Sequence, residues 1–329
     1  GIVLVSGKGK RKTPIQRLSE WIDQCLAKLK QYTKDIHICG NRNSFSKTDH
    51  DATFMHMKED YMRNGQLKPG YNVNVATCSD FIIGSYISSD RNDVHTLIPF
   101  MEQLRKNYAG RNIGSVVVDS GYESEENYCW FEAHPETELY VKPSNHEAVK
   151  HRKYRTDISR RENMAYDAQT DTYTCANGKL LQRTREKKTH TASGLEIATS
   201  VYECNECDGC PLKEKCIRAC GSKKPMEERY KVIYVSKRFA RQRQAMEAKI
   251  SSPKGCLLRV NRSIQAEGNF AYVKQDLDFR RFLLRGNMKV AAEWLLFSLA
   301  LNILHLHHKI QNRRLESDLK IPSSFPAGL

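Results

Sequence analysis

The sequence predicts an α/β protein in which helices flank a mixed sheet, with a β-rich, cysteine-containing segment inserted before the last helices of the core. Three observations predict this class. Residues 71–87 read as two consecutive strands, residues 115–142 read as strand, helix and strand, and helical periodicity returns after residue 238. An alternation of strands and helices along the chain is typical of α/β folds.

The first elements follow from the spacing of apolar residues. Residues 16–32 are predicted to form an amphipathic helix, and residues 35–70 show no clear period. Residues 71–77 alternate apolar and polar side chains, as a half-buried strand does, and residues 81–87 are predicted to be its hairpin partner. The predicted helix places these side chains on one face: Leu18, Ile22, Cys25, Leu26 and Leu29.

The centre of the chain continues this pattern. Asp93 is expected to cap a helix that runs to about Tyr108, with one apolar face formed by Val94, Leu97, Ile98, Met101 and Leu104. Residues 115–119 are a short apolar run that ends in an acid, as in a strand buried on both faces. A helix from Ser124 and a strand over residues 138–142 are expected to follow.

Five segments are predicted from these patterns. They are a helical and loop segment (1–70), the first part of the core (71–143), the β-rich insertion with a cysteine cluster (144–236), C-terminal helices that complete the core (237–310), and a loose tail (311–329). The strongest helix is expected over residues 287–308. Its predicted apolar side consists of Val290, Trp294, Leu295, Leu299, Ile303 and Leu306.

Positive charge is concentrated in one part of the chain. The formal net charge is +15 and the isoelectric point is about 9.3. Residues 213–262 contain 15 Lys and Arg against 4 Asp and Glu, a local net charge of +11. Basic side chains release counterions when they bind phosphates, so this density favours a nucleic-acid partner over an ordinary solvated surface.

The sequence gives no sign of a membrane or secretory protein. The longest apolar run, residues 294–301, is shorter than the ~20 residues of a membrane span. The apolar residues 1–5 do not follow a basic stretch, as they would in a secretory signal. The 11 cysteines do not resemble the disulfide framework of a small secreted protein. We therefore expect a reducing, cytoplasmic location and no membrane partner.

Five cysteines crowd into residues 204–220 at spacings that suit a metal site. Cys204, Cys207, Cys210 and Cys216 are the expected ligands of a structural zinc ion, with Cys220 as the spare. An iron–sulfur cluster and reduced, unliganded thiols remain alternatives.

Two acids are the candidate catalytic residues. Asp119 ends a predicted strand, where α/β folds place their sites, although an Asp at this position often only caps its own turn. Glu267 is expected on a helix, with Lys274 two turns further on, and its alternative is a surface ion pair. Arg262, Arg280, Arg281 and Arg285 surround Glu267 in the sequence. Carboxylates bind Mg²⁺ through hard oxygens, while nearby cations hold phosphates.

Four motifs occur in an order that resembles the DDE transposases of bacterial insertion sequences, in the branch with a Cys-rich insertion. The motifs are residues 117–127 (VVDSGYESEEN), 202–216 (YECNECDGCPLKEKC), 262–274 (RSIQAEGNFAYVK) and 279–286 (FRRFLLRG). Residues 46–52 and 70–75 also fit. The resemblance covers roughly residues 44–308.

The resemblance implies an RNase H-like fold in which Asp119 and Glu267 are the second and third acids of a triad that binds Mg²⁺ or Mn²⁺. It implies that Lys274 holds DNA phosphate, with the same expected for Arg280, Arg281, Arg285 and, one residue out of the usual register, Arg262. The implied partners are double-stranded DNA of element ends and target, and a second copy of the chain in a synaptic complex at the bacterial nucleoid.

The first acid of the triad has no clear counterpart. We expect it upstream of Gly1, with Asp49 or Asp51 as fallback, so this chain alone is expected to be inactive. Two other functions remain open at this point. One is a catalytically inactive, truncated remnant that only binds DNA, and the other is an RNase H-like nuclease without strand transfer.

Overall fold

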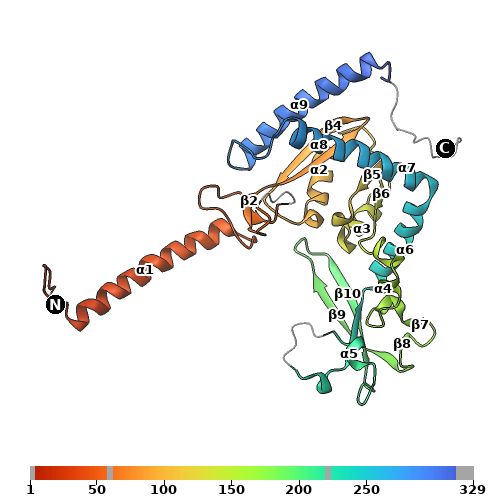
Figure 1. The fold of residues 1–329 in the computed structure, drawn as a ribbon, viewed down its shortest axis with the longest axis horizontal. Helices are drawn as coiled ribbons and strands as arrows, with labels where there is room; N and C mark the ends of the chain where they lie inside the picture. Colours follow the sequence, from red (N-terminus) through yellow and green to blue (C-terminus); the bar gives the residue numbers. More distant parts are fainter. Residues whose placement is uncertain (1–3, 58–61, 219–223, 316–329) are drawn as a thin grey trace. The chain divides into compact units, whose positions relative to one another are not determined.

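A computed structural model describes residues 4–57, 62–218 and 224–315 (Figure 1). The chain forms two compact units. Unit 1 combines the N-terminal segment up to Ala76 with Phe81–Asn92 and Ala271–Arg313. Unit 2 contains Thr77–Asp80, Asp93–Phe270 and the chain from Arg314. Each unit is considered by itself below.

Unit 1 begins with the long helix α1 (Pro14–Cys39). The Thr13 side chain caps it by accepting a hydrogen bond from the Gln16 amide at 3.2 Å, and Pro14 occupies the first helical position. The helix predicted over residues 16–32 is therefore confirmed and extends further at its C-terminal end. Its apolar stripe is not buried within the described structure, because Leu18 and Leu29 are 56% and 61% exposed.

Two antiparallel strand pairs follow in this unit. Strands β1 (Thr53–Met55) and β2 (Lys68–Gly70) pair with each other in a segment that showed no period in the sequence. Strands β3 (Asn72–Cys78) and β4 (Phe81–Ser88) form the expected hairpin. Ser79 and Asp80 both have positive φ angles, 51° and 72°, which is the backbone that a tight hairpin turn requires.

Helix α9 (Asn287–Gln311) lies against β4. The Asn302 side chain donates to the Ile82 carbonyl and accepts from the Ile82 amide, both at 2.8 Å. Val290, Trp294 and Leu301 are buried. The prediction was wrong for the other four residues of the apolar side, because only a narrow stripe of α9 faces β4. The exposed residues are Leu295, Leu299, Ile303 and Leu306.

By length and composition α9 would be able to cross a membrane, which the short apolar run in the sequence did not suggest. One such helix is weak evidence for a span, since core helices of other proteins have the same properties.

The α/β core of unit 2 is built on a parallel strand pair. Strands β5 (Ser115–Val118) and β6 (Glu138–Val141) pair from Ser115↔Glu138 to Val118↔Val141. Helices α2 (Leu97–Asn107) and α3 (Glu125–Glu132) pack together beside them. The prediction that β5 is buried on both faces was wrong, since its residues are half-buried or exposed; among the described strands it has β6 as its single neighbour.

The α/β character expected from the sequence is thus present. Among the described residues, β3–β4 and β5–β6 are separate pairs rather than one continuous mixed sheet. The start of α2 also differs from the prediction. Asp93 opens a short 3₁₀ turn, η1 (Asp93–His95), and α2 begins only after Thr96.

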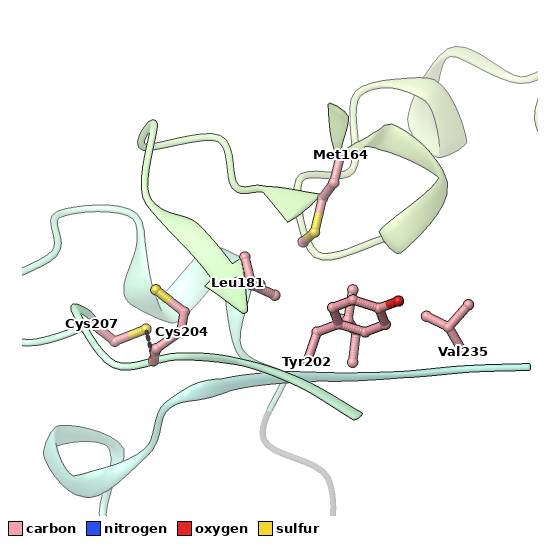
Figure 2. Packing of buried hydrophobic residues seen from close by; sticks show 7 residues of the cluster. Met164, Leu181, Tyr202, Cys204, Cys207 and Val235 are labelled. Carbon is pink, nitrogen blue, oxygen red and sulfur yellow. Dashed lines mark hydrogen bonds between the residues drawn. The ribbon is translucent and has the colours of Figure 1, made fainter. Parts of the chain in front are cut away.

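The segment between β6 and the last helices of unit 2 forms an antiparallel sheet in the order β11-β10-β9-β8-β7. Its strands are β7 (Ala165–Asp167), β8 (Thr172–Thr174), β9 (Leu180–His190), β10 (Glu196–Cys204) and β11 (Lys231–Val235). A small core holds the sheet, with Tyr202 in the middle, Cys204 and Cys207 at one end and Val235 at the other (Figure 2).

Short helical turns connect these elements: η2 (Ser120–Tyr122), η3 (Ala148–Lys150), α4 (Arg152–Arg155), η4 (Arg161–Asn163), α5 (Lys213–Cys216) and η5 (Met226–Glu228). The C-terminal helices begin with α6 (Lys237–Ser251) and α7 (Pro253–Arg262). The chain then continues through η6 (Ser263–Glu267), α8 (Gly268–Ala271) and η7 (Tyr272–Asp276), and both η6 and η7 are π-helical.

A buried carboxylate ties the core of unit 2 together. The Glu123 side chain is 1% exposed, and its two oxygens accept hydrogen bonds from Arg243 Nε at 2.7 Å and Nη2 at 2.9 Å. The same carboxylate accepts from the Tyr128 hydroxyl and the Ser144 amide. A charge removed from water is tolerated only when it is paired and hydrogen-bonded in this way.

Replacing Glu123 by Ala should lower the free energy of unfolding of unit 2 by about 3 kcal/mol, because the Arg243 guanidinium loses its partner. Denaturant unfolding would measure this change. The control is Lys188→Ala, which breaks the exposed 2.9 Å pair with Glu196 and should change stability by less than about 1 kcal/mol. Equal losses in the two variants would contradict the role assigned to Glu123.

A second acid stabilises the β-rich sheet in a pH-dependent way. Asp171 accepts hydrogen bonds from Lys237, Tyr202 and Tyr166. The Lys237 ammonium is the main cause that holds the pKa of Asp171 at about 2, below its ordinary value. A lowered pKa gives stability that is present above pH ~4 and is lost as the pH falls towards 2.

Asp171→Asn should therefore weaken the sheet at pH 7 and make it less sensitive to acid between pH 4 and 2. Hydrogen exchange of the β8–β10 amides at several pH values would show this. Asp23→Asn on the exposed surface of α1 serves as control and should leave the exchange unchanged. An unaltered acid response in Asp171→Asn would refute the assignment.

Candidate active site

Asp119 lies where strand β5 ends. It caps the following turn, η2, by accepting a hydrogen bond from the Ser120 amide at 2.7 Å, and it is exposed. Asp119 therefore does cap its own turn, which the sequence analysis gave as an alternative to a catalytic role. One carboxylate oxygen, Oδ1, accepts from Ser120, and no hydrogen bond within the described structure uses the other. The cap orients Asp119 without using the whole carboxylate.

A second carboxylate lies against the same turn. A methyl group built on Gly121 would lie 3.0 Å from Asp93 Oδ2, so a larger residue at this position would require the Asp93 carboxylate to shift slightly. The Tyr122 side chain hydrogen-bonds to Thr96 from the same segment as Asp93. Burial raises the pKa of Tyr122, the nearby carboxylates of Asp93 and Asp119 raise it further, and the Arg262 guanidinium lowers it.

Glu267 ends the π-helical turn η6, a type of turn that is frequent at functional sites. Its side chain is 63% exposed. Arg262 Nη2 donates to one oxygen at 3.0 Å, and Ser263 Oγ donates to the other at 3.0 Å. The surface ion pair weighed in the sequence analysis is thus present, and it fixes the direction of the carboxylate.

Packing within unit 2 links the two acids. Helix α7 lies against strand β5, β5 leads directly into Asp119, and α7 leads through Arg262 into the turn that carries Glu267 (Figure 1). Asp119 and Arg262 both act electrostatically on Tyr122. Asp119 and the Arg262–Glu267 pair thus follow two elements of unit 2 that pack against each other.

The donor atoms of this neighbourhood suit a hard divalent cation. Asp119, Glu267 and Asp93 supply carboxylate oxygens, the ligand type that Mg²⁺ and Mn²⁺ prefer. In the part of the chain that the structure describes, no three acidic, His or Cys side chains are already arranged as a coordination shell. The chemistry fits such an ion, and the carboxylates would have to turn towards it.

The other sequence-predicted residues lie in unit 1. Lys274 is exposed in η7, and the π-helical turns do not keep the 3.6-residue period on which its placement beside Glu267 rested. Arg280 pairs with Asp278, Arg281 lines a shallow cavity of about 490 Å³, and Arg285 Nη1 donates to the Thr48 carbonyl at 3.4 Å. Their phosphate contacts stay predictions.

The two fallback acids have a structural role at the start of α9. Asp49 Oδ1 accepts from the Gly286 amide at 3.2 Å, and Asp51 Oδ2 accepts from the Asn287 amide at 2.8 Å. Tyr71 donates to Asp49 Oδ2 at 2.7 Å. Negative charge beside free amides at a helix N-terminus is stabilising. Asp49 and Asp51 thereby anchor α9.

Part of the positive charge between residues 213 and 262 is neutralised inside the protein. Among the described residues at least seven of these basic side chains form ion pairs, and the buried Glu123 and Glu125 pair with two arginines of α6. The seven are Lys213, Arg218, Lys237, Arg238, Arg243, Lys254 and Arg262. The local excess of positive charge offered to a partner is therefore smaller than the sequence count suggests.

The cysteine cluster gathers around a small cavity. Cys204, Cys207, Cys210 and Cys216 line it, as the sequence predicts, and Cys175 from the turn between β8 and β9 joins them. Burial raises the pKa of the Cys204 thiol to about 11, and burial also raises that of Cys216. Cys220 lies outside the described residues.

Sequence reasoning missed three features of these sites. Asp93 looked like a helix cap, the Glu123–Arg243 pair spans 120 residues, and Cys175 stands alone in the sequence. The pair Gly121 and Asp93 carries no local signal either. The C-x-x-G sequence at residues 175–178 is a local signal for a turn, and Gly178 has a positive φ of 72°.

Comparison with known families adds one finding. Residues 174–307 match the model of the family described as a transposase DDE domain. This match supports a DDE transposase, a class of enzymes that transfers phosphoryl groups in nucleic acids and generally uses divalent metal ions. The matched span includes the cysteine cluster and Glu267, whereas Asp119 precedes it. Neither a curated protein nor a solved structure matches the chain.

The close approach of Gly121 to Asp93 is directly testable. Gly121→Ala should displace the Asp93 carboxylate and lower the free energy of unfolding by less than about 1 kcal/mol, because the carboxylate ends a flexible side chain and needs to move only slightly. The matched control is Gly114→Ala, because a methyl group there would meet no heavy atom within 4 Å. Denaturant unfolding measures both, and a loss of several kcal/mol in Gly121→Ala would show that the Asp93 carboxylate is held rigidly against the turn.

Proposed function

We propose that the chain is the catalytic domain of a DDE transposase, with an RNase H-like core, that cleaves and joins DNA strands at insertion-sequence ends. The observation that carries the proposal is the packing of α7 against β5, because β5 leads into the strand-end acid Asp119 and α7 leads into the turn with Glu267. The family match over residues 174–307 supports the same assignment.

In this proposal Asp119 and Glu267 hold Mg²⁺ or Mn²⁺. Such an ion, when bound, activates an attacking water or 3′-hydroxyl and stabilises charge on the leaving oxygen. The Ser120 amide holds one oxygen of Asp119, and the other oxygen would bind the ion. Arg262 and Ser263 orient Glu267, which makes Arg262 a positioning residue in addition to a phosphate contact.

The basic residues of unit 1 would hold the DNA. Lys274, Arg280, Arg281 and Arg285 supply charge for phosphate contacts along double-stranded DNA. A synaptic complex of two copies would bring two element ends together. Cytoplasmic, nucleoid-associated DNA is the expected setting.

Two substitutions test the catalytic assignment. In the protein extended by the upstream segment that is expected to carry the first acid, Glu267→Gln and Asp119→Asn keep size and hydrogen bonding but remove the charge, so Mn²⁺-dependent nicking of supercoiled plasmid should fall by at least about 100-fold. Glu196→Gln is the matched control, because Glu196 is likewise an exposed acid in an ion pair, with Lys188, and it should keep wild-type nicking. Wild-type nicking in Glu267→Gln would exclude the proposed role.

A second measurement does not depend on turnover. Electron paramagnetic resonance counts protein-bound Mn²⁺, and both site variants should bind it at least about tenfold more weakly than the control. Undiminished Mn²⁺ binding would contradict the shared site. Mn²⁺ binding together with DNA binding but no cleavage would favour the inactive remnant. Cleavage of element ends without joined products would favour a nuclease that lacks strand transfer.

A further inference from the structure

A cavity in the β-rich sheet is surrounded by more thiols than the sequence spacing predicts. Its volume is about 20 Å³, room for one water-sized occupant. Five cysteines line it, from three separate segments: Cys175, Cys204, Cys207, Cys210 and Cys216. Disulfide bonds among the described cysteines are absent. We propose that this cavity binds one structural zinc ion through four of its thiols, and that Cys175 is one of the four.

The local backbone is already folded for such a site. The Glu206 amide donates to the Cys204 thiol, and the Lys231 amide donates to Cys207 Sγ at 3.4 Å. Cys175 lies in a closed turn, because its amide donates to the Lys179 carbonyl at 2.8 Å. Amide donors to sulfur are the outer contacts that orient metal-bound ligands.

A buried lysine gives an independent reason to expect negative charge in the cavity. Lys231 is 9% exposed, and its ammonium donates to the carbonyls of Ser159 at 2.7 Å and Cys216 at 3.0 Å. Among the described residues no carboxylate forms an ion pair with it. A buried cation without a counter-ion is costly. Zinc with four thiolates carries a net charge of −2, and Lys231 would face that charge.

Cys175 lies close to the other thiols of the cavity. Cys204 interacts electrostatically with Cys207 and Cys175, and Cys216 interacts with Cys175, Cys207 and Cys210. The Cys210 amide donates to the Cys207 carbonyl at 3.4 Å, so Cys210 belongs to the same cluster. The thiols are not yet placed as a coordination shell, and rotation about their side-chain bonds would bring the sulfurs inward.

The size of the surrounding core explains why a metal would be useful. Seven buried residues form it, and two of them are Cys204 and Cys207 (Figure 2). Figure 2 shows that their sulfurs lie at the end of this cluster, away from Val235. Strand β9 is exposed along most of its length. A small core of this kind gains much of its stability from a bound structural metal.

The test compares two single substitutions in the full chain. Cys175→Ser should retain zinc at least about tenfold more weakly, measured by metal content after dialysis against a competing chelator. Cys25→Ser is the control, because Cys25 is exposed on α1 and does not line the cavity, and it should match wild type. X-ray absorption on the wild-type zinc protein should give four sulfurs at about 2.3 Å. Equal zinc retention in the two variants would overturn the role of Cys175.

Two further results would decide whether the cavity binds zinc. Less than half an equivalent of zinc in wild type, or iron with acid-labile sulfide instead, would overturn the zinc site. A poorly folded Cys175→Ser variant would lose zinc for another reason. Hydrogen exchange of β10 and β11 is therefore also measured on the wild-type protein, before and after chelation. Protection should fall on chelation and return with added zinc, and unchanged protection would refute a structural ion.

Discussion

Unit 2 depends on the Glu123 carboxylate, which is removed from water and satisfied by Arg243, Tyr128 and Ser144. Its partners come from α6, α3 and the chain after β6, so one charge fixes three elements around the turn that follows Asp119. A buried acid leaves little freedom, because loss of any donor exposes an unpaired charge. The position of the candidate active site rests on this constraint.

Other carboxylates also hold elements together by accepting hydrogen bonds from several partners. Glu125 binds Arg238 on the same helix pair, Asp171 gathers two tyrosines and Lys237 in the β-rich sheet, and Asp49 with Asp51 anchors α9 in unit 1. In this basic chain, several acidic side chains therefore stabilise contacts within the protein.

The candidate active site and the cysteine cavity use opposite chemistry within unit 2. Hard carboxylate oxygens on an exposed strand end and π-helical turn suit an exchangeable divalent ion that meets a substrate. Buried thiols in a closed cavity suit an ion that stays and holds the fold.

The sequence by itself determined the local elements: α1, the β3–β4 hairpin, Asp119 at a strand end, and the order of motifs that resembles transposases. Periodicity and turn chemistry act over a few residues, so one chain segment suffices to read them. Only the tertiary structure decided that Asp49 and Asp51 cap α9, that Asp93 touches Gly121, that seven basic residues are internally paired, and that Cys175 joins the cluster. Those outcomes depend on contacts between residues far apart in the chain, for which the sequence contains no local pattern.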